Sequence, residues 1–225
     1  MYYVLITPTV KLVKQYNRLY MHENMEADWH VQLFKGMEDV DIRDYVDFDK
    51  WNENDMKISG YVENKNMEDL FKTLNTNYHT HLKTKRISEA LETWDKLEHM
   101  TVDQFVAVCY EQTGKHAYSF ATKVFNFING KSYPILDSYV VTLLEQYLNA
   151  SDKSHYNQDK KTMSKKDWDT YERYKSAYDT FRDKYQLTDL SYKETDVFLW
   201  AYGSAIQKYW KKIGVLSFES VSYKR

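Results

Sequence analysis

The chain has 225 residues, of which 43% are hydrophobic and 16% aromatic, and this is enough apolar material for one large core or two small ones. Its formal net charge is −2. Residues 1–100 contain 18 acidic and 13 basic side chains, whereas residues 101–225 contain 15 acidic and 18 basic ones, so only the second half offers phosphates a favourable charge. Six glycines and two prolines are too few for the turns of a many-stranded sandwich or barrel. A single cysteine excludes an intramolecular disulfide, and the sequence contains no run of about 18 apolar residues, the length that a membrane-spanning helix needs. We therefore expect a mainly α-helical, cytoplasmic protein that forms a single domain over residues 1–225.

The first part of the chain, residues 1–75, is predicted to combine a short extended segment with helices. The apolar run at 3–7 ends at a proline and indicates a short N-terminal strand or arm. Over residues 10–25 the apolar side chains follow a helical spacing. The acidic stretch 38–55 contains eight acids, two bases and no clear period, so we interpret it as mostly loop. A short helix is predicted at 67–74, and the role of this whole part is left open.

The middle of the chain carries two recognisable helix starts. Ser88 can cap a helix whose core-facing side chains are Leu91, Trp94 and Leu97. Thr101 followed by Gln104 resembles a capping box, in which each side chain binds the backbone of the other residue. A buried helix should run from there to Gly114, with the sole cysteine, Cys109, in its apolar stretch.

The second half is predicted to contain four more helices. One covers residues 120–128, and the next opens at Asp137. A lysine-rich polar stretch at 151–166 is interpreted as an exposed loop. Two helices follow, over about 168–185 and 193–213. The last of them is expected to bury Val197, Trp200, Ala201, Ile206, Tyr209 and Trp210.

Two short segments in this half support a functional hypothesis. Segment 118–124 reads Tyr-Ser-Phe-Ala-Thr-Lys-Val, and segment 133–140 reads Tyr-Pro-Ile-Leu-Asp-Ser-Tyr-Val. In this order they resemble the helix-hairpin-helix DNA glycosylase superfamily, and within it the bacterial proteins described as 8-oxoguanine DNA glycosylase-like. In that superfamily a Gly-Val-Gly-Thr-Lys-Val hairpin leads into a helix, and a Pro-Val-Asp or Pro-Ile-Leu-Asp segment follows. Residues 122–124 and 134–137 match these patterns, and residues 196–200 are similar to a late helix in such proteins.

The resemblance implies a fold, an activity and a pair of catalytic residues. Residues 84–213 form the most glycosylase-like part of the chain. The implied activity is removal of a damaged or modified base, such as an oxidised purine, from double-stranded DNA, with or without a lyase step. Lys123 is the implied nucleophile and Asp137 the assisting carboxylate. No cofactor, no metal and no obligatory protein partner is expected.

The reaction itself explains why a lysine and an aspartate are needed. A partly desolvated lysine loses its proton more readily, and its free amine can attack the sugar carbon and form a Schiff base. A nearby carboxylate can stabilise the positive charge that develops on the sugar. On a helical wheel Lys123 lies at the border of an apolar face, where we expect an amine that is partly dry and partly open. That face is formed by Phe120, Val124, Phe127 and Ile128.

Substrate contacts are predicted at aromatic side chains and at the hairpin backbone. A base removed from the duplex is held by stacking, so the first aromatic candidates are Tyr118, Tyr133, Tyr139 and Trp200. Exposed N–H groups at a helix start can bind a phosphate, which assigns that role to Ser119, Phe120 and Ala121. The family has glycines where this chain has Ser119 and Ala121, and these residues restrict the hairpin's positive φ angles.

Simpler interpretations of the same residues remain open. Asp137 alone is typical of a helix N-cap, and Lys123 alone is typical of a side chain that snorkels at the edge of a core. His79 and His81 lack the partner ligands of a metal site and are interpreted as solvated. The functional alternative is a non-catalytic DNA-binding or protein-interaction module on the same scaffold, and a helical domain that resembles glycosylases by chance is the third hypothesis.

Overall fold

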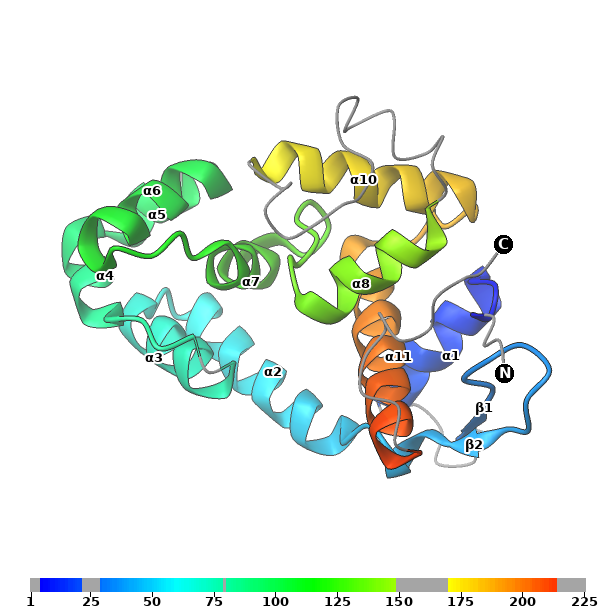
Figure 1. The fold of residues 1–225 in the computed structure, drawn as a ribbon. Coiled ribbons are helices and arrows are strands. Elements are labelled where there is room, and N and C mark those ends of the chain that lie inside the picture. Colours follow the sequence, from blue (N-terminus) through cyan, green and yellow to red (C-terminus); the bar gives the residue numbers. More distant parts are fainter. Residues whose placement is uncertain (1–4, 22–28, 79, 149–169, 214–225) are drawn as a thin grey trace.

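A computed structural model describes residues 5–21, 29–78, 80–148 and 170–213 (Figure 1). Helices dominate these residues, which confirms the mainly α-helical prediction. In chain order the elements are α1 (Val10–Met21), strands β1 (His30–Val31) and β2 (Val40–Asp41), the 3₁₀ turn η1 (Ile42–Asp44), α2 (Phe48–Glu63), α3 (Met67–Asn77), α4 (Thr84–Leu91), α5 (Trp94–Glu98), α6 (Val102–Thr113), α7 (Tyr118–Asn129), α8 (Ser138–Tyr147), α10 (Tyr171–Lys184) and α11 (Tyr192–Lys212). Among the described residues, no helix has the length and apolar character needed to cross a bilayer.

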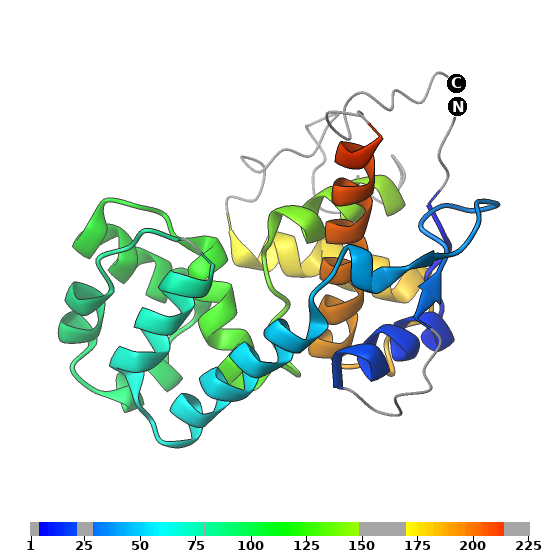
Figure 2. The same ribbon diagram turned by 90° about the horizontal axis from the view of Figure 1, so that it is seen from below.

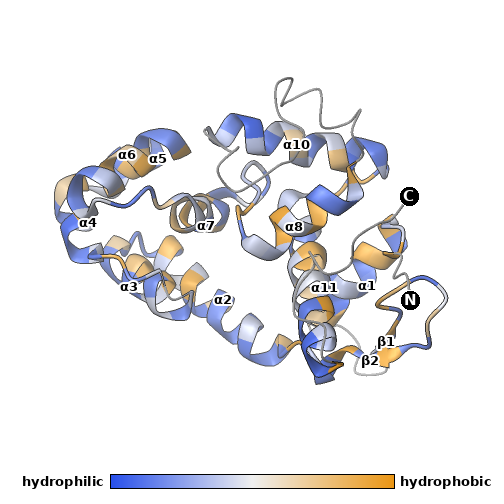
Figure 3. Cartoon of the chain, viewed as in Figure 1, coloured by the Kyte–Doolittle hydropathy of each residue, from blue (hydrophilic) through white to orange (hydrophobic). Residues whose placement is uncertain are grey.

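The helices form two groups that share one hydrophobic core. Helices α3 to α7 pack together, and helices α1, α8, α10 and α11 form the second group with the small β1–β2 sheet (Figures 1 and 2). Helix α2 connects the groups, because it contacts α1 as well as α3 and α7. Most helices carry hydrophobic and hydrophilic residues on different sides, as amphipathic packing requires (Figure 3). The division into a glycosylase-like part and an N-terminal part stays a prediction.

Helix α11 is the central element of the second group. Its predicted buried residues Val197, Ala201, Ile206 and Trp210 are buried, whereas Trp200 and Tyr209 are half-buried. At Gly203 the helix passes so close to α8 that an added Cβ would lie 3.0 Å from Tyr139 Cβ and 3.3 Å from the Tyr139 carbonyl oxygen. The glycine therefore sets how closely α8 and α11 approach.

Several predicted helix boundaries are confirmed. Thr101 and Gln104 form a complete capping box at the start of α6, and Gly114 ends that helix in the left-handed conformation, with φ 72°. Asp137 caps α8. The predicted N-terminal arm is represented by Leu5, which forms an antiparallel bridge with Phe34.

Two predicted boundaries are wrong. Ser88 lies inside α4 and caps nothing; the cap farther along is Thr93, which starts α5 after Glu92 turns the chain at φ 64°. The acidic stretch 38–55 is not mostly loop, because α2 begins at Phe48. Asp47 caps this helix, and acidic side chains are favourable near a helix N-terminus. Phe48, Asp55 and Ile58 of the helix are buried. Residues 3–4, 22–25, 79, 151–166 and 168–169 of the predicted elements lie outside the described residues.

Candidate functional site

Lys123 and Asp137 meet at the junction of the two helix groups. Lys123 belongs to the second turn of α7, and Asp137 immediately precedes α8. The distance from Lys123 Nζ to Asp137 Oδ2 is 3.4 Å, and the two side chains are 3% and 15% exposed. Lys123 Nζ also donates to Ser119 Oγ at 2.8 Å and to the Ser119 carbonyl oxygen at 3.3 Å. The amine and the carboxylate are thus close enough to act on one atom of a ligand.

The amine of Lys123 is more enclosed than the helical wheel predicts. The ring of Tyr78, the residue that ends α3, lies 4.7 Å from Nζ and covers it. The helical wheel contains only α7 and therefore misses this long-range contact. Lys123 is consequently buried and not at an open border. Burial and the negative charges of Asp55 and Asp137 raise the pKa of the Tyr78 phenol well above its usual value, so this ring stays neutral.

Asp137 uses its two carboxylate oxygens for different partners. Oδ1 accepts a hydrogen bond from the backbone N–H of Tyr139 at 2.9 Å, which caps α8. Oδ2 faces Lys123. The N-cap interpretation and the pairing with lysine are therefore both correct, and neither excludes the other.

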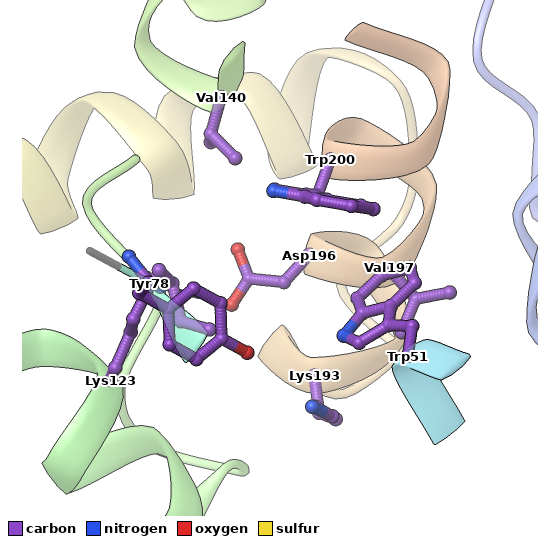
Figure 4. Close-up of a pocket in the computed structure, with 9 residues that line it drawn as sticks. Trp51, Tyr78, Lys123, Val140, Lys193, Asp196, Val197 and Trp200 are labelled. Carbon is purple, nitrogen blue, oxygen red and sulfur yellow. Dashed lines mark hydrogen bonds between the residues drawn. The ribbon is translucent and has the colours of Figure 1, made fainter. Parts of the chain in front are cut away.

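A pocket opens beside this pair (Figure 4). The space inside it that a water-sized sphere can enter is about 20 Å³, so the pocket is narrow in this structure, and further space beside it opens to solvent. Trp51 and Trp200 form an aromatic corner, with ring centroids 4.4 Å apart at an interplanar angle of 48°. The residues that line the pocket are Trp51, Tyr78, Lys123, Ile135, Val140, Lys193, Asp196, Val197 and Trp200. They come from both helix groups and from α2, so the pocket depends on how these parts pack together.

Of the four aromatic side chains predicted to hold a base, only Trp200 lines the pocket. Tyr139 packs edge-on against Trp200, with ring centroids 6.0 Å apart, and supports it from outside. Tyr118 donates its phenolic hydrogen to Asp103 of α6 at 2.6 Å. Tyr133 stacks against Tyr171 and makes a tilted contact with Phe125. Tyr118 and Tyr133 are therefore engaged with residues of other helices outside this pocket, and their contact with a base stays a prediction.

The predicted phosphate contacts of the hairpin need correction. Phe120 packs in the core, and Ala121 is also buried. Their backbone N–H groups both donate to the carbonyl oxygen of Ala117, so they are not available to a phosphate. Without the family's glycines this segment is the first turn of α7, and Ser119 contacts the amine of Lys123 instead.

A second ion pair borders the pocket. Lys193 of α11 donates to Asp55 of α2 at 2.6 Å, and the hydroxyl of Tyr20 donates to the same oxygen at 2.6 Å. Asp55 is buried, so its partners offset the cost of removing a carboxylate from water. This pair joins α2 to α11 next to Trp51, and it ties residues of the N-terminal part to the site.

Asp196 is the buried carboxylate of the pocket. In Figure 4 its carboxylate points toward the side where Lys123 and Tyr78 lie. Burial raises its pKa to about 7, although hydrogen bonds from the Ile135 N–H and the Tyr178 hydroxyl and the charge of Lys193 act in the opposite direction. The charge of Asp137 adds to the increase. Asp196 therefore changes its charge near neutral pH.

Four residues of the pocket were not predicted from the sequence as site residues: Trp51, Tyr78, Lys193 and Asp196. A lone carboxylate in the apolar run 196–200, four positions before Trp200, was a usable signal, because the two side chains share one helix face. Trp51 was hidden in a stretch interpreted as loop. No local pattern could have paired Tyr78 with Lys123, since the contact joins distant segments.

Neither a metal site nor a known relative identifies the function. Within the described residues no three or more His, Cys, Asp and Glu side chains are grouped so that they could hold a metal ion. Comparison with protein families, with curated proteins and with solved structures finds no match for this chain. The functional hypothesis therefore depends on the geometry of the site.

Proposed function

We propose that this chain is a DNA glycosylase-like enzyme on a helix-hairpin-helix type of scaffold, which removes a damaged or modified base from double-stranded DNA. Lys123 is the nucleophile and Asp137 the assisting carboxylate. The observation that carries the proposal is the 3.4 Å approach of a buried lysine amine to a carboxylate beside an aromatic pocket. An oxidised purine is the substrate class that the sequence resemblance favours.

The proposed chemistry assigns one step to each side chain. The neutral amine of Lys123 attacks C1′ of the deoxyribose, the glycosidic bond breaks, and its electron pair and a proton go to the departing base. Asp137 accepts the first proton that the attacking nitrogen loses, passes it to the departing base, and stabilises the positive charge on the sugar. The C1′–O4′ bond then breaks as the C=N bond forms, and the second nitrogen proton goes to O4′, which yields a Schiff base on Lys123. Burial of the amine favours its neutral form, whereas the nearby carboxylate favours the ammonium.

The pocket offers aromatic faces to a base that has left the duplex, and its usable volume of about 20 Å³ means that it has to widen to admit one. Trp51 and Trp200 offer aromatic faces for stacking, which holds an extruded base without requiring a particular sequence. Tyr78 covers the amine in this structure, so the sugar reaches Nζ only after that ring moves aside.

Basic side chains offer a surface for the phosphates near the start of α7. Lys83, Lys85 and Arg86 are exposed at the beginning of α4 and line a shallow hollow. Lys115, in the turn between α6 and α7, donates to the carbonyl oxygen of His81 at 3.1 Å, so this turn lies beside that cluster. Contacts of this kind are independent of base sequence and weaken as salt increases.

The non-catalytic DNA-binding module is the second candidate. It is favoured by the enclosure of the Lys123 amine between Ser119, Asp137 and Tyr78, and by a hairpin segment whose N–H groups are used inside the protein. This candidate keeps the basic surface and the pocket and lacks covalent chemistry.

Borohydride trapping tests the proposal. Duplexes that carry 8-oxoguanine, other modified bases or an abasic site are incubated with protein and reductant, and a covalent adduct is expected with at least one of them. Lys123→Met forms no adduct, and Asp137→Asn binds DNA but reacts more slowly by about 10²-fold or more. Lys96→Met, at an exposed lysine on α5, is the matched control and traps like wild type. DNA binding without base release or trapping supports the module, and absence of DNA binding overturns both candidates.

A further inference from the structure

The loop between α7 and α8 delivers Asp137 to the site, and side chains hold its backbone almost completely. The carbonyl oxygen of Tyr133 accepts from Asn126 Nδ2 at 2.7 Å. The next carbonyl oxygen, that of Pro134, accepts from the hydroxyl of Tyr171 at 3.0 Å. The backbone N–H of Leu136 donates to Thr122 Oγ1 at 3.0 Å. These partners belong to α7 and α10, so the loop is clamped from two sides. A short loop held in this way has few alternative conformations.

The carboxylate of Asp196 is the centre of this clamp. Its Oδ2 accepts from the backbone N–H of Ile135 at 2.9 Å and from Asn126 Nδ2 at 3.3 Å. Its Oδ1 accepts from the hydroxyl of Tyr178 at 2.8 Å. Asp196 is buried, with 3% of its surface exposed, and each of its carboxylate oxygens accepts from a protein donor. Three donors converge on two oxygens, an arrangement that suits an ionised carboxylate, which is only an acceptor.

We infer that Asp196 is a positioning residue, which holds Asp137 against Lys123 by anchoring the backbone of Ile135. Ile135 lies two residues before Asp137, and Thr122, the neighbour of Lys123, binds Leu136 between them. A shift of Ile135 therefore changes the distance between Lys123 Nζ and Asp137 Oδ2. The effect of this positioning on catalysis rests on the proposed function. The anchoring of Ile135 by Asp196 does not depend on that function.

The charged and titratable groups around Asp196 make its anchoring depend on pH. Lys193 on α11 stabilises the carboxylate, and Asp137 destabilises it. Further groups that border it are Lys123 on α7, Tyr78 at the end of α3, and Tyr174 and Tyr178 on α10. The pKa of about 7 means that half of the molecules lose the anionic acceptor near neutrality. Protonation places a hydrogen on an oxygen that now accepts, and this weakens the hold on Ile135.

Hydrogen exchange of the Ile135 amide tests the anchoring in the full chain, without any need for activity. Asp196→Leu replaces the carboxylate with a side chain that has no acceptor, and we expect the Ile135 amide to exchange about tenfold faster, the loss of roughly one hydrogen bond. The amide of Val124, within α7, reports on global unfolding, so the change at Ile135 is measured relative to the change at Val124. Tyr178→Phe removes the hydrogen bond to Oδ1 only, so Ile135 stays anchored at high pH. Because that hydrogen bond lowers the pKa of Asp196, its loss should raise the pH at which the Ile135 amide begins to exchange faster. Ile135 exchange in Asp196→Leu that is unchanged relative to Val124 overturns the inference.

The rate of trapping tests the catalytic consequence. If wild type reacts with a lesion, Asp196→Leu lowers the maximal rate about 10- to 100-fold and leaves KM for the duplex unchanged, because displaced catalytic groups are costly even when the ligand still binds. The wild-type rate rises through a step near pH 7 that is absent in Asp196→Asn. A retained step, or an equal loss in KM, refutes the positioning role. If wild type never reacts, the proposed function fails, and the exchange of Ile135 still decides whether Asp196 anchors the loop.

Discussion

The buried carboxylate of Asp196 should make folding stability depend on pH in an unusual direction. Its pKa rises from an ordinary value near 3.8 in the unfolded chain to about 7 in the folded protein. Between these two values the folded state binds more protons than the unfolded state, so the free energy of unfolding falls as pH rises. One proton over about three pH units corresponds to roughly 4 kcal/mol, an upper figure that is gained at low pH and lost above pH 7.

Asp196→Asn isolates this contribution, because asparagine does not titrate. Urea unfolding followed by tryptophan fluorescence gives the stability of wild type and variant at intervals from pH 4 to pH 8. The stability of the variant relative to wild type should increase by up to about 4 kcal/mol across this range, whatever its pH-independent offset. Asp189→Asn, at an exposed position, is the control and should give a flat difference. A flat difference for Asp196→Asn as well would show that burial of this carboxylate does not perturb its titration.

Other substitutions test the packing and the pocket. Gly203→Ala should lower the free energy of unfolding by about 1–3 kcal/mol in the same urea assay, because the added Cβ meets α8 at 3.0 Å. Gly60→Ala, where nothing lies within 4 Å of the added Cβ, should be neutral or stabilise by roughly 0.5–1 kcal/mol, and equal effects at both glycines would contradict the packing described for α11. Trp200→Ala should weaken binding to a lesion-containing duplex by about 1–3 kcal/mol and leave binding to undamaged duplex nearly unchanged, as measured by fluorescence anisotropy. An equal loss for both duplexes would place Trp200 outside the base pocket.

Local sequence patterns predicted the parts of the site that are close in the chain. The caps at Thr101 and Asp137 were found because a cap depends on residues within one helical turn. The approach of Lys123 to Asp137 was predicted from the order of two motifs only fourteen residues apart. These features require little knowledge of how the helices pack.

The remaining parts of the site depend on contacts that no short window contains. The high density of acids concealed the start of α2, so Trp51 and Asp55 were not expected near α11. Phe120 was expected on the apolar face of its helix, but its ring contacts with Phe71 of α3 and Phe105 of α6 join segments that no short window contains. Helix periodicity shows which residues face the core, and only the arrangement of the helices shows which residues they contact there.

The divided use of the Asp137 carboxylate couples the ion pair with Lys123 to the rigidity of the first turn of α8 in a single side chain. A replacement that removes both oxygens removes the cap of α8 as well as the ion pair with Lys123. A loss of activity in such a variant could therefore come from either change. Asparagine keeps an oxygen for the Tyr139 N–H and lacks the negative charge, and it therefore separates the two origins where alanine mixes them. The same coupling means that this aspartate would be retained for folding even in a descendant that had abandoned chemistry.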